Sequence, residues 1–432
     1  MQSPFSFHRP VRCGRAWRIG LVMTLLACSC APEMPGSPAR PTRPVGIPSD
    51  ATSPAGISDQ IVVTLAPGAD PEVLANDYGA TLVSASEGFA TLRFSGDLVL
   101  ADGSPSLAGD ARVLSAEPDA WLESPETRQE SFAFDDGLGS EATYLEQPAA
   151  AAIGLPAAHL ISTGRDVRVA ILDTGADLSH PALAGRIAGG WDFVSGDADP
   201  TDTPDGVDND EDGRTDEGWG HGTHVAGIVA LAAPAADLLI ERVLDAEGRG
   251  DIQSVAAGVM WAVEHGAKVI NLSLGMPRPS LAIEYALQNA VEHGVVVVAS
   301  AGNSGSEFPR EYPAASVYAL AIGAVDAMAR PASFTSYGFR LDLCAPGVGV
   351  RSAFPGGGYL VWSGTSMSAP FVAGTVALLL ELHPRWKLDQ VLTRLTRSAA
   401  PLVDVSPEES GKLGAGALNT AAALEPPGLP VP

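Results

Sequence analysis

The sequence predicts an α/β protein with a mostly parallel sheet and helices on both faces, preceded by a small α+β domain of the ferredoxin-like type. Short apolar runs rich in β-branched residues recur at 167–172, 238–243, 268–273, 295–300 and 318–325. Helical patterns lie between or after these runs, at 222–231, 253–265, 281–293 and 366–382. Continuous apolar strands that alternate with helices are typical of a parallel sheet covered on both sides.

The smaller domain is predicted from a different order of elements within residues 59–124. The runs QIVVTL, PEVLANDYGA, TLVSA and FATLRF predict a strand, a helix and two further strands. A weak helical stretch around 97–111 and a final strand at RVLSAEP complete the series. This order is typical of a ferredoxin-like α+β domain.

The first residues predict a targeting segment rather than a structural element. Several arginines precede the apolar run IGLVMTLLA at 19–27, and Cys28 follows it directly. A run of this length cannot span a bilayer, which needs about 20 helical residues. Residues 1–27 resemble a bacterial lipoprotein signal, in which the cysteine becomes lipidated; the alternative is an ordinary cleaved signal peptide. A flexible tether rich in Pro, Ser and Gly occupies 28–58.

The remaining boundaries follow from composition. The acidic stretch 125–142 has few aliphatic residues and predicts an exposed linker. The larger domain then covers 143–425, and 426–432 form a C-terminal tail. Lysine and arginine number 26 against 51 acidic residues, a net charge of −25, which argues against nucleic acid and anionic lipid as partners. The four cysteines are too few for a disulfide framework, and Cys344 is expected to be buried.

Polar side chains suited to acyl transfer stand at the ends of the predicted elements. Asp173 and Asn303 follow predicted strands, whereas His221 and Ser366 each open a predicted helix. In parallel sheets the functional crevice lies at the carboxyl ends of the strands. A serine nucleophile needs a base, the base needs a carboxylate, and the developing oxyanion needs preorganised donors. Taken singly, each of these residues could instead be a cap or a structural residue.

The motifs around these residues resemble the subtilisin-type serine peptidases, the subtilase family. They are DTGADLSHP, GHGTHVAG, NLSLG, AGN and GTSMSAP, in this order. The resemblance covers roughly 145–425, and 59–120 resembles the family's inhibitory propeptide. It implies an orienting acid, a general base, a nucleophile and an oxyanion donor, which are Asp173, His221, Ser366 and Asn303. Two nearby histidines, His180 and His224, are expected to make structural hydrogen bonds.

The resemblance also implies where a peptide substrate binds. Family members bind the substrate as an added β-strand between two chain segments, which here are Gly248, Arg249 and Gly250 on one side and Ser273, Leu274 and Gly275 on the other. The stretch SGSEFPREYP after Asn303 does not align clearly with the family, so the preferred side chain before the scissile bond stays open. Ala182 stands where many relatives carry a calcium-binding aspartate, which puts that site in doubt.

An acidic stretch precedes His221 directly. Residues 197–217 contain ten acidic side chains and a single basic one, Arg214. Within it, the spacing of Asp208, Asp210, Asp212 and Asp216 around a glycine resembles an oxygen-ligand calcium loop. Trp219 stands where a helix-loop-helix calcium hand would end in glutamate. We therefore expect a solitary structural Ca²⁺ loop that fixes the approach to His221; the alternative is a solvated acidic surface.

These observations predict an exported serine endopeptidase, made as a self-processing precursor with a lipid anchor at Cys28. Its partners are polypeptide substrates and its own propeptide, and we expect a monomer whose membrane contact is the anchor alone. Processing would release the catalytic domain to the periplasm or the exterior. Two rival functions remain at this stage: a catalytically silent calcium-binding surface lipoprotein, and an esterase or amidase with the same triad.

Overall fold

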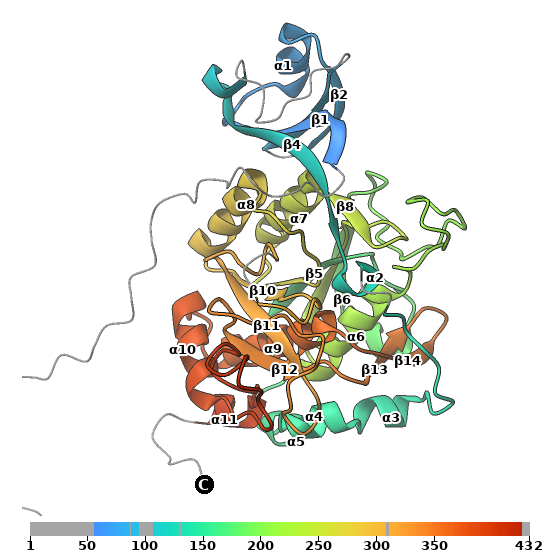
Figure 1. Cartoon of the computed structure of the whole chain (residues 1–432), viewed down its shortest axis with the longest axis vertical. Coiled ribbons are helices and arrows are strands. Elements are labelled where there is room, and N and C mark those ends of the chain that lie inside the picture. The colour runs from blue at the N-terminus through green and yellow to red at the C-terminus, as the bar shows by residue number, and fades with distance from the viewer. Residues whose placement is uncertain (1–55, 87, 95–106, 129–130, 308–310, 426–432) are drawn as a thin grey trace, which may run out of the picture. The chain divides into compact units, whose positions relative to one another are not determined.

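The computed structural model describes residues 56–86, 88–94, 107–128, 131–307 and 311–425 (Figure 1). All of them belong to one structural unit, 46–432. The predicted signal peptide, Cys28, nearly all of the tether and the C-terminal tail lie outside the described residues.

A seven-stranded sheet forms the centre of the larger domain. Its order is β12-β11-β10-β9-β5-β7-β6, and all neighbouring pairs are parallel. The strands are β5 Arg168–Asp173, β6 Ile187–Asp192, β7 Asp237–Arg242, β9 Val269–Leu272, β10 Val296–Ser300, β11 Ala319–Val325 and β12 Leu343–Pro346. The five predicted strands are confirmed, and β6 and β12 are additions. The runs in β9, β10 and β11 are buried throughout, because both faces of the sheet are covered.

Helices cover both faces of this sheet, which confirms the predicted fold class. Helices α6 His221–Ala232 and α9 Thr365–Leu382 share one hydrophobic core with one face of the strands. Helices α7 Ile252–Glu264 and α8 Leu281–Glu292 share a second core with the other face. Helix α9 is long and apolar enough to cross a membrane, but 89% of it is buried inside the fold. Its composition is therefore that of a central core helix.

Shorter elements complete the larger domain. The hairpin of β13 Val350–Phe354 and β14 Gly358–Trp362 lies against α6. Helix α10 Leu388–Ser398 packs on α11 Thr420–Leu424. The remaining helices of the larger domain are α3 Glu141–Leu145, α4 Pro148–Ala152, α5 Leu155–Ala158 and the 3-10 turn η2 Pro181–Leu183.

The smaller domain is an antiparallel sheet with one helix. Its elements are β1 Gly56–Leu65, α1 Pro71–Asp77, β2 Thr81–Ser86, β3 Phe89–Arg93, the 3-10 turn η1 Leu107–Gly109 and β4 Val113–Glu123. The strand order is β2-β3-β1-β4, with a core of its own that includes Val63, Leu74 and Leu92. Of the second predicted helix, the described residues contain only η1. Strand β4 continues beyond this domain and pairs with β8 Arg249–Asp251 of the larger one.

Buried hydrogen bonds join the smaller domain to α7 and α8. The side chain of Gln253 accepts a hydrogen bond from the Thr91 hydroxyl at 2.6 Å. The Glu117 carboxylate accepts the Ser280 hydroxyl at 2.7 Å and the Ala282 N–H at 2.9 Å, at the start of α8. These contacts hold β4 so that its end enters the larger domain beside β8.

Candidate active site

The proposed catalytic side chains meet at the carboxyl edge of the parallel sheet. Asp173 is the last residue of β5, and Asn303 lies just beyond the end of β10. His221 is the first residue of α6, and Ser366 lies in the first turn of α9. Strand ends and helix starts share this edge because each helix returns the chain to the next parallel strand. The structure therefore brings four residues that lie far apart in the sequence to one edge of the sheet, where the Ser366 hydroxyl itself donates to the Ser273 carbonyl at 3.4 Å.

Asp173 and His221 form a buried pair. The Asp173 Oδ1 atom lies 2.7 Å from His221 Nδ1, and neither side chain is exposed to solvent. The Thr174 N–H also donates to Oδ1, at 2.8 Å, which fixes the carboxylate. This contact keeps the proton on Nδ1 and directs Nε2 toward the cleft.

A second buried carboxylate, Asp202, supports this pair. It accepts the Gly220 N–H at 2.9 Å and the Thr174 hydroxyl at 3.1 Å, so it ties the end of β5 to the start of α6. Burial, together with the nearby Asp173 charge, raises the pKa of Asp202 to about 7. The sequence analysis did not identify Asp202, because it stood among ten acidic residues of similar appearance.

Two hydrogen-bond donors converge on one point beside Ser366. The Asn303 side-chain N–H₂ and the Ser366 backbone N–H both donate to the same oxygen, Oε1 of Glu126, at 2.7 and 3.3 Å. The Asn303 amide is held in place because its oxygen accepts the backbone N–H and the hydroxyl of Thr365, each at 2.9 Å. A pair of preorganised donors aimed at one anionic oxygen is the arrangement that stabilises an oxyanion.

Glu126 is a second residue of the candidate site that the sequence did not predict. It lies in the short helix α2 Pro125–Arg128, is fully buried, and places its other oxygen, Oε2, 3.1 Å from His221 Nε2. The prediction of an exposed linker over 125–142 is therefore wrong for Pro125 and Glu126. These two residues are buried because strand β4 delivers them directly into the cleft. No local pattern around PETR signals this contact.

Charge explains the state of the histidine. Burial disfavours its charged form, but Asp173 and Glu126 on either side outweigh this and raise the pKa of His221 to about 10. Burial likewise opposes the charge of Glu126, but hydrogen bonds and the His221 charge lower the pKa of this carboxyl below its ordinary value. In this structure His221 is therefore a protonated imidazolium between two carboxylates at neutral pH.

The expected substrate-binding segments hold the end of β4. Leu122 pairs with Gly250 and Glu123 with Arg249 in an antiparallel ladder. On the opposite side, Glu123 and Gly275 exchange backbone hydrogen bonds of 3.0 and 2.8 Å. A Cβ at position 250 would lie 2.0 Å from a backbone oxygen, so only glycine fits there. Ser273 and Leu274 lie buried behind this edge, and the Gly248 carbonyl accepts the Ser124 N–H at 3.0 Å.

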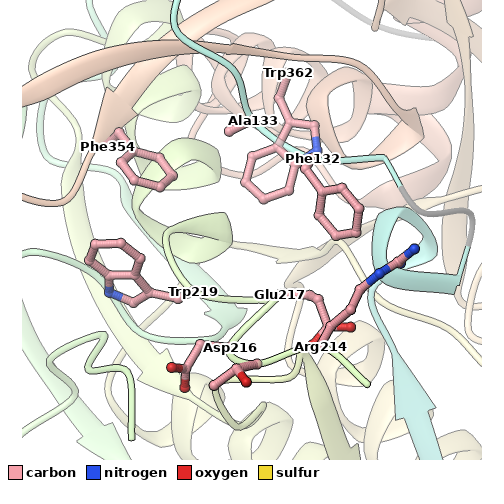
Figure 2. A pocket seen from close by; sticks show the side chains of 9 residues that line it. Phe132, Ala133, Arg214, Asp216, Glu217, Trp219, Phe354 and Trp362 are labelled. Atoms are coloured by element: carbon pink, nitrogen blue, oxygen red, sulfur yellow. The ribbon is translucent and has the colours of Figure 1, made fainter. Parts of the chain in front are cut away.

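The chain crosses to the other side of His221 after α2. Phe134 pairs with Val361 of β14 through two backbone hydrogen bonds of 3.0 Å, and the Trp362 indole donates to the Ser131 carbonyl at 2.9 Å. A hollow opens here, lined by aromatic side chains (Figure 2), and its lining includes Phe132, Trp219, Phe354 and Trp362. The Trp362 ring also packs edge to face on the His221 ring, with 5.3 Å between the two ring centroids. The protein's own chain thus occupies the cleft on both sides of the candidate catalytic residues.

The acidic loop brings together three of its four predicted ligands. Carboxylate oxygens of Asp208, Asp210 and Asp212 lie within 4.8 Å of one another. Asp216 is not in this group, because its carboxylate accepts the backbone N–H groups of Asp205 and Gly206. Such a cluster of hard oxygen donors suits a calcium ion.

Backbone and charge contacts connect this loop to the cleft. The Gly218 N–H donates to the Ala246 carbonyl at 2.8 Å, and Arg249 of β8 lies 3.8 Å from Asp210. Trp219 packs edge to face on Phe354 of the hairpin. The loop therefore adjoins both the substrate edge and the start of α6.

The other two histidines are structural, as expected. His224 Nε2 lies 3.3 Å from the Leu360 carbonyl, and burial lowers the pKa of His224 to about 3, so the ring stays neutral. His180 contacts the Gly358 carbonyl at 2.8 Å and accepts the Ala182 N–H at 3.1 Å.

The site combines a buried Asp–His pair with a serine at a helix start, at the edge of a parallel sheet. Its cleft binds an extended strand. These features define a serine hydrolase that accepts extended peptide. The chain belongs to the subtilase family, whose sequence pattern matches residues 164–418. It is a subtilisin-like serine endopeptidase.

Individual relatives agree with this assignment. Subtilisin BL from Lederbergia lenta is 42% identical over 272 residues, which cover 61% of this chain and 94% of the relative. Subtilisin E from Bacillus subtilis is 38% identical over 290 residues, covering 63% of this chain and 70% of the relative.

Solved structures show the same fold. Fervidolysin from Fervidobacterium pennivorans, a keratinolytic enzyme related to subtilisin, superposes with a TM-score of 0.69 at 25% identity. That match covers 86% of this chain but only 61% of fervidolysin, less than two thirds of its length. A cold-adapted subtilisin-like serine proteinase matches at 31% identity with a TM-score of 0.53, over 60% of this chain and 90% of the other.

Proposed function

We propose that Asp173, His221, Ser366 and Asn303 carry out peptide hydrolysis in this endopeptidase. The observation that supports this most strongly is the convergence of the Asn303 amide and the Ser366 N–H on one anionic oxygen beside His221 Nε2. The negatively charged oxygen of a tetrahedral intermediate would find both of its hydrogen-bond donors at this position. The position also lies beside His221, the base that would take the proton of the nucleophile.

The chemistry follows from these positions. The Ser366 hydroxyl attacks the scissile carbonyl carbon, and its proton passes to His221 Nε2. Asp173 holds the Nδ1–H and stabilises the imidazolium, while the carbonyl oxygen takes its negative charge toward Asn303 and the Ser366 N–H. The imidazolium then gives its proton to the leaving amine as the C–N bond breaks. A water molecule, activated in the same way, hydrolyses the acyl-enzyme and restores Ser366.

The uncut chain is an inhibited precursor in this proposal. Residues 59–124 form the inhibitory domain, and the end of β4 fills the substrate edge between Gly250 and Gly275. Glu126 then blocks both remaining parts of the site, because one of its oxygens fills the oxyanion position and the other accepts the Nε2–H of His221, which keeps the base protonated. Activation consists of cutting within 125–142 and losing these contacts.

Export and membrane anchoring precede processing in this proposal. Residues 1–27 direct export, Cys28 carries the lipid, and 28–58 tether the protein to the membrane. The anchor stays on the propeptide side of the cut, so processing releases the catalytic domain, 143–425 with the adjoining linker, as a monomer. The order of the segments in the sequence supports this, because the lipid signal precedes the inhibitory domain and the catalytic domain follows both.

A structural calcium ion would be held by Asp208, Asp210 and Asp212. The support is the approach of three carboxylate oxygens to within 4.8 Å, which like charges do not favour without a cation. Asp210 adds to this: burial and the neighbouring carboxylates raise its pKa, although backbone hydrogen bonding and Arg249 oppose the rise. The ion would neutralise the loop and so hold the chain that leads to His221.

The test of the catalytic assignment is Ser366→Ala, assayed by digestion of an unfolded protein. We expect a loss of about 10⁶-fold in kcat, the value known for the nucleophile of subtilisin itself. The fold should persist, because replacing serine at a helix start costs about 0.5–2 kcal/mol. Ser254→Ala, in the first turn of α7, is the matched control and should keep full activity. More than about 1% residual activity in Ser366→Ala would refute the assignment.

A further inference from the structure

A carboxylate stands behind the substrate edge and was not part of the predicted site. Glu311 fills the space in front of the backbone of Gly275 and Gly302: a Cβ at 275 would lie 2.2 Å from its Oε1, and one at 302 would lie 3.2 Å from its Cδ. Backbone hydrogen bonds of 2.8 Å in both directions between Tyr312 and Met276 hold the Glu311 segment against this edge. The Glu311 side chain is 14% exposed.

This place lies between two parts of the cleft already described. Gly275 makes the backbone hydrogen bonds that align an extended chain, as it does here with Glu123. Gly302 directly precedes Asn303, which donates to the oxyanion position. A substrate strand that runs from Gly275 toward the oxyanion position must turn the side chain of its last residue into the space between these glycines. That residue supplies the scissile carbonyl, and Glu311 is what its side chain meets.

The chain's own Arg128 already occupies this space. Its guanidinium forms an ion pair with Glu311, in which Nη2 binds Oε1 and Nη1 lies 3.5 Å from Oε2. Glu123 lies 3.6 Å from Nε and adds a second negative charge. The Arg128 side chain is 27% exposed, so most of it lies within the protein. A cation fits here for a physical reason, because a carboxylate so enclosed is costly without a charged partner.

We infer that Glu311 selects the substrate side chain before the scissile bond, an inference that rests on the proposed function. The enzyme then cuts polypeptides after arginine or lysine. Arginine satisfies both carboxylate oxygens with a planar pair of donors, whereas lysine offers a single charged point. An apolar side chain would leave the Glu311 carboxylate buried against it with no partner. The pocket therefore favours arginine over lysine, and both over phenylalanine or leucine.

The test compares peptides that differ only in the residue before the scissile bond, namely Arg, Lys, Phe and Leu. For the processed wild type we expect kcat/KM for the Arg peptide to exceed that for the Phe peptide by about 10–100-fold. In Glu311→Gln, which keeps the shape and removes the charge, that ratio should fall toward unity. Glu307→Gln is the matched control, since Glu307 is half exposed and pairs with Lys412 at 2.9 Å. It should keep the wild-type ratio.

A second measurement needs no variant and so does not depend on whether Glu311→Gln folds or matures. Wild-type enzyme digests an unfolded protein mixture, and the new termini are sequenced. Cuts mostly after arginine and lysine support the inference; cuts mostly after apolar residues, or an Arg-to-Phe ratio unchanged by Glu311→Gln, overturn it. Failure of the proposed catalytic function looks different, because a fluorophosphonate probe would then leave Ser366 unlabelled and no peptide would be cut.

Discussion

Asp173 and Glu126 together set the protonation state of His221, the proposed general base, in the uncut chain. Its carboxylate lies opposite Asp173, with the His221 imidazole between the two. The ion pair holds the imidazolium, which cannot act as a base. Removing Glu126 from the cleft therefore does two things at once: it empties the oxyanion position and returns the histidine toward an ordinary pKa.

The first prediction at the scale of residues concerns pH. The pKa of His221 is raised from 6.5 to about 10. The contacts of the charged imidazolium therefore contribute their full stabilisation of the docked linker below about pH 6.5, and this stabilisation is lost as the pH rises through about 10. In a Ser366→Ala precursor, NMR titration of His221 should give a pKa near 10, and Glu126→Gln should lower it. His224, whose pKa is about 3, serves as an internal reference that stays neutral. A His221 pKa that Glu126→Gln leaves unchanged would contradict the account.

The second prediction concerns the oxyanion donor. Asn303→Ala removes the amide but leaves the Ser366 N–H, so kcat should fall by about 10²–10³, the loss known for the oxyanion asparagine of subtilisin itself. KM should change little, because the donor acts on the transition state. Steady-state kinetics on a peptide substrate measure both, with the exposed Gln288→Ala on α8 as control. An unchanged kcat would mean that another group holds the oxyanion.

At the scale of elements, helix α6 depends on the loop that precedes it. Its first residue is the proposed catalytic base, yet Gly220 before it has φ of +88° and gives no side-chain cap. Instead, the Thr174 hydroxyl accepts the Gly222 N–H at 2.9 Å, and Asp202 accepts both the Thr174 hydroxyl and the Gly220 N–H. The Ala246 carbonyl accepts the Gly218 N–H and so fixes the chain between the acidic loop and α6. The position of His221 is therefore set by contacts from outside its own helix.

The calcium prediction belongs to this loop. A ligand that binds only the native state stabilises it by mass action, by about 2.7 kcal/mol at a hundredfold excess over Kd. Melting of the Ser366→Ala precursor, which cannot digest itself, should therefore occur at a higher temperature in calcium than in chelator. Replacing Asp210 and Asp212 by Asn should remove most of that difference, whereas Glu292→Gln with Glu408→Gln, an equal change of charge on exposed residues, should not. If the difference persists in the aspartate variant, the ion binds elsewhere.

The elements of the sheet differ in how well the sequence predicts them. Strands β9, β10 and β11 are mostly apolar and include β-branched residues, and short runs of this kind are typical of buried strands. Strand β6, IAGGWD, contains two glycines, and β12 spans only LCAP, so neither carries a clear strand pattern. Both are strands because neighbouring strands supply their hydrogen bonds, which is tertiary information.

At the scale of the whole molecule, the residues of the site also divide into those that a local sequence pattern identifies and those that only the tertiary structure reveals. Asp173, His221, Asn303 and Ser366 stand in motifs that identify them locally. Glu126 and Glu311 stand in no motif, and their partners lie far away in the sequence: Glu126 meets Asn303, and Glu311 meets Arg128. Only the path of β4 across the larger domain brings these groups together. The linker was predicted to be exposed from its composition, which does not encode that path.

The order of the segments leads to a prediction about processing. Wild type should yield a soluble catalytic fragment, whereas Ser366→Ala should stay full length in the membrane fraction, because bacterial lipid anchors carry more than one chain. If Arg128 fills its own specificity pocket, sequencing of the soluble fragment should give a terminus at Gln129. Arg128→Gln should slow this cut, and Arg165→Gln, an exposed arginine of the larger domain, should not. Active full-length protein in the membrane would contradict release.

Ser366, activated by His221, is the proposed nucleophile of this peptidase. The most direct measurement treats processed wild type and a His221→Ala variant with a fluorophosphonate probe and locates the adduct by peptide mass spectrometry. The account predicts one adduct, on Ser366, in wild type and a loss of about 10⁴-fold or more in labelling rate in the variant. An adduct on another serine, or equal labelling of the two proteins, would contradict it.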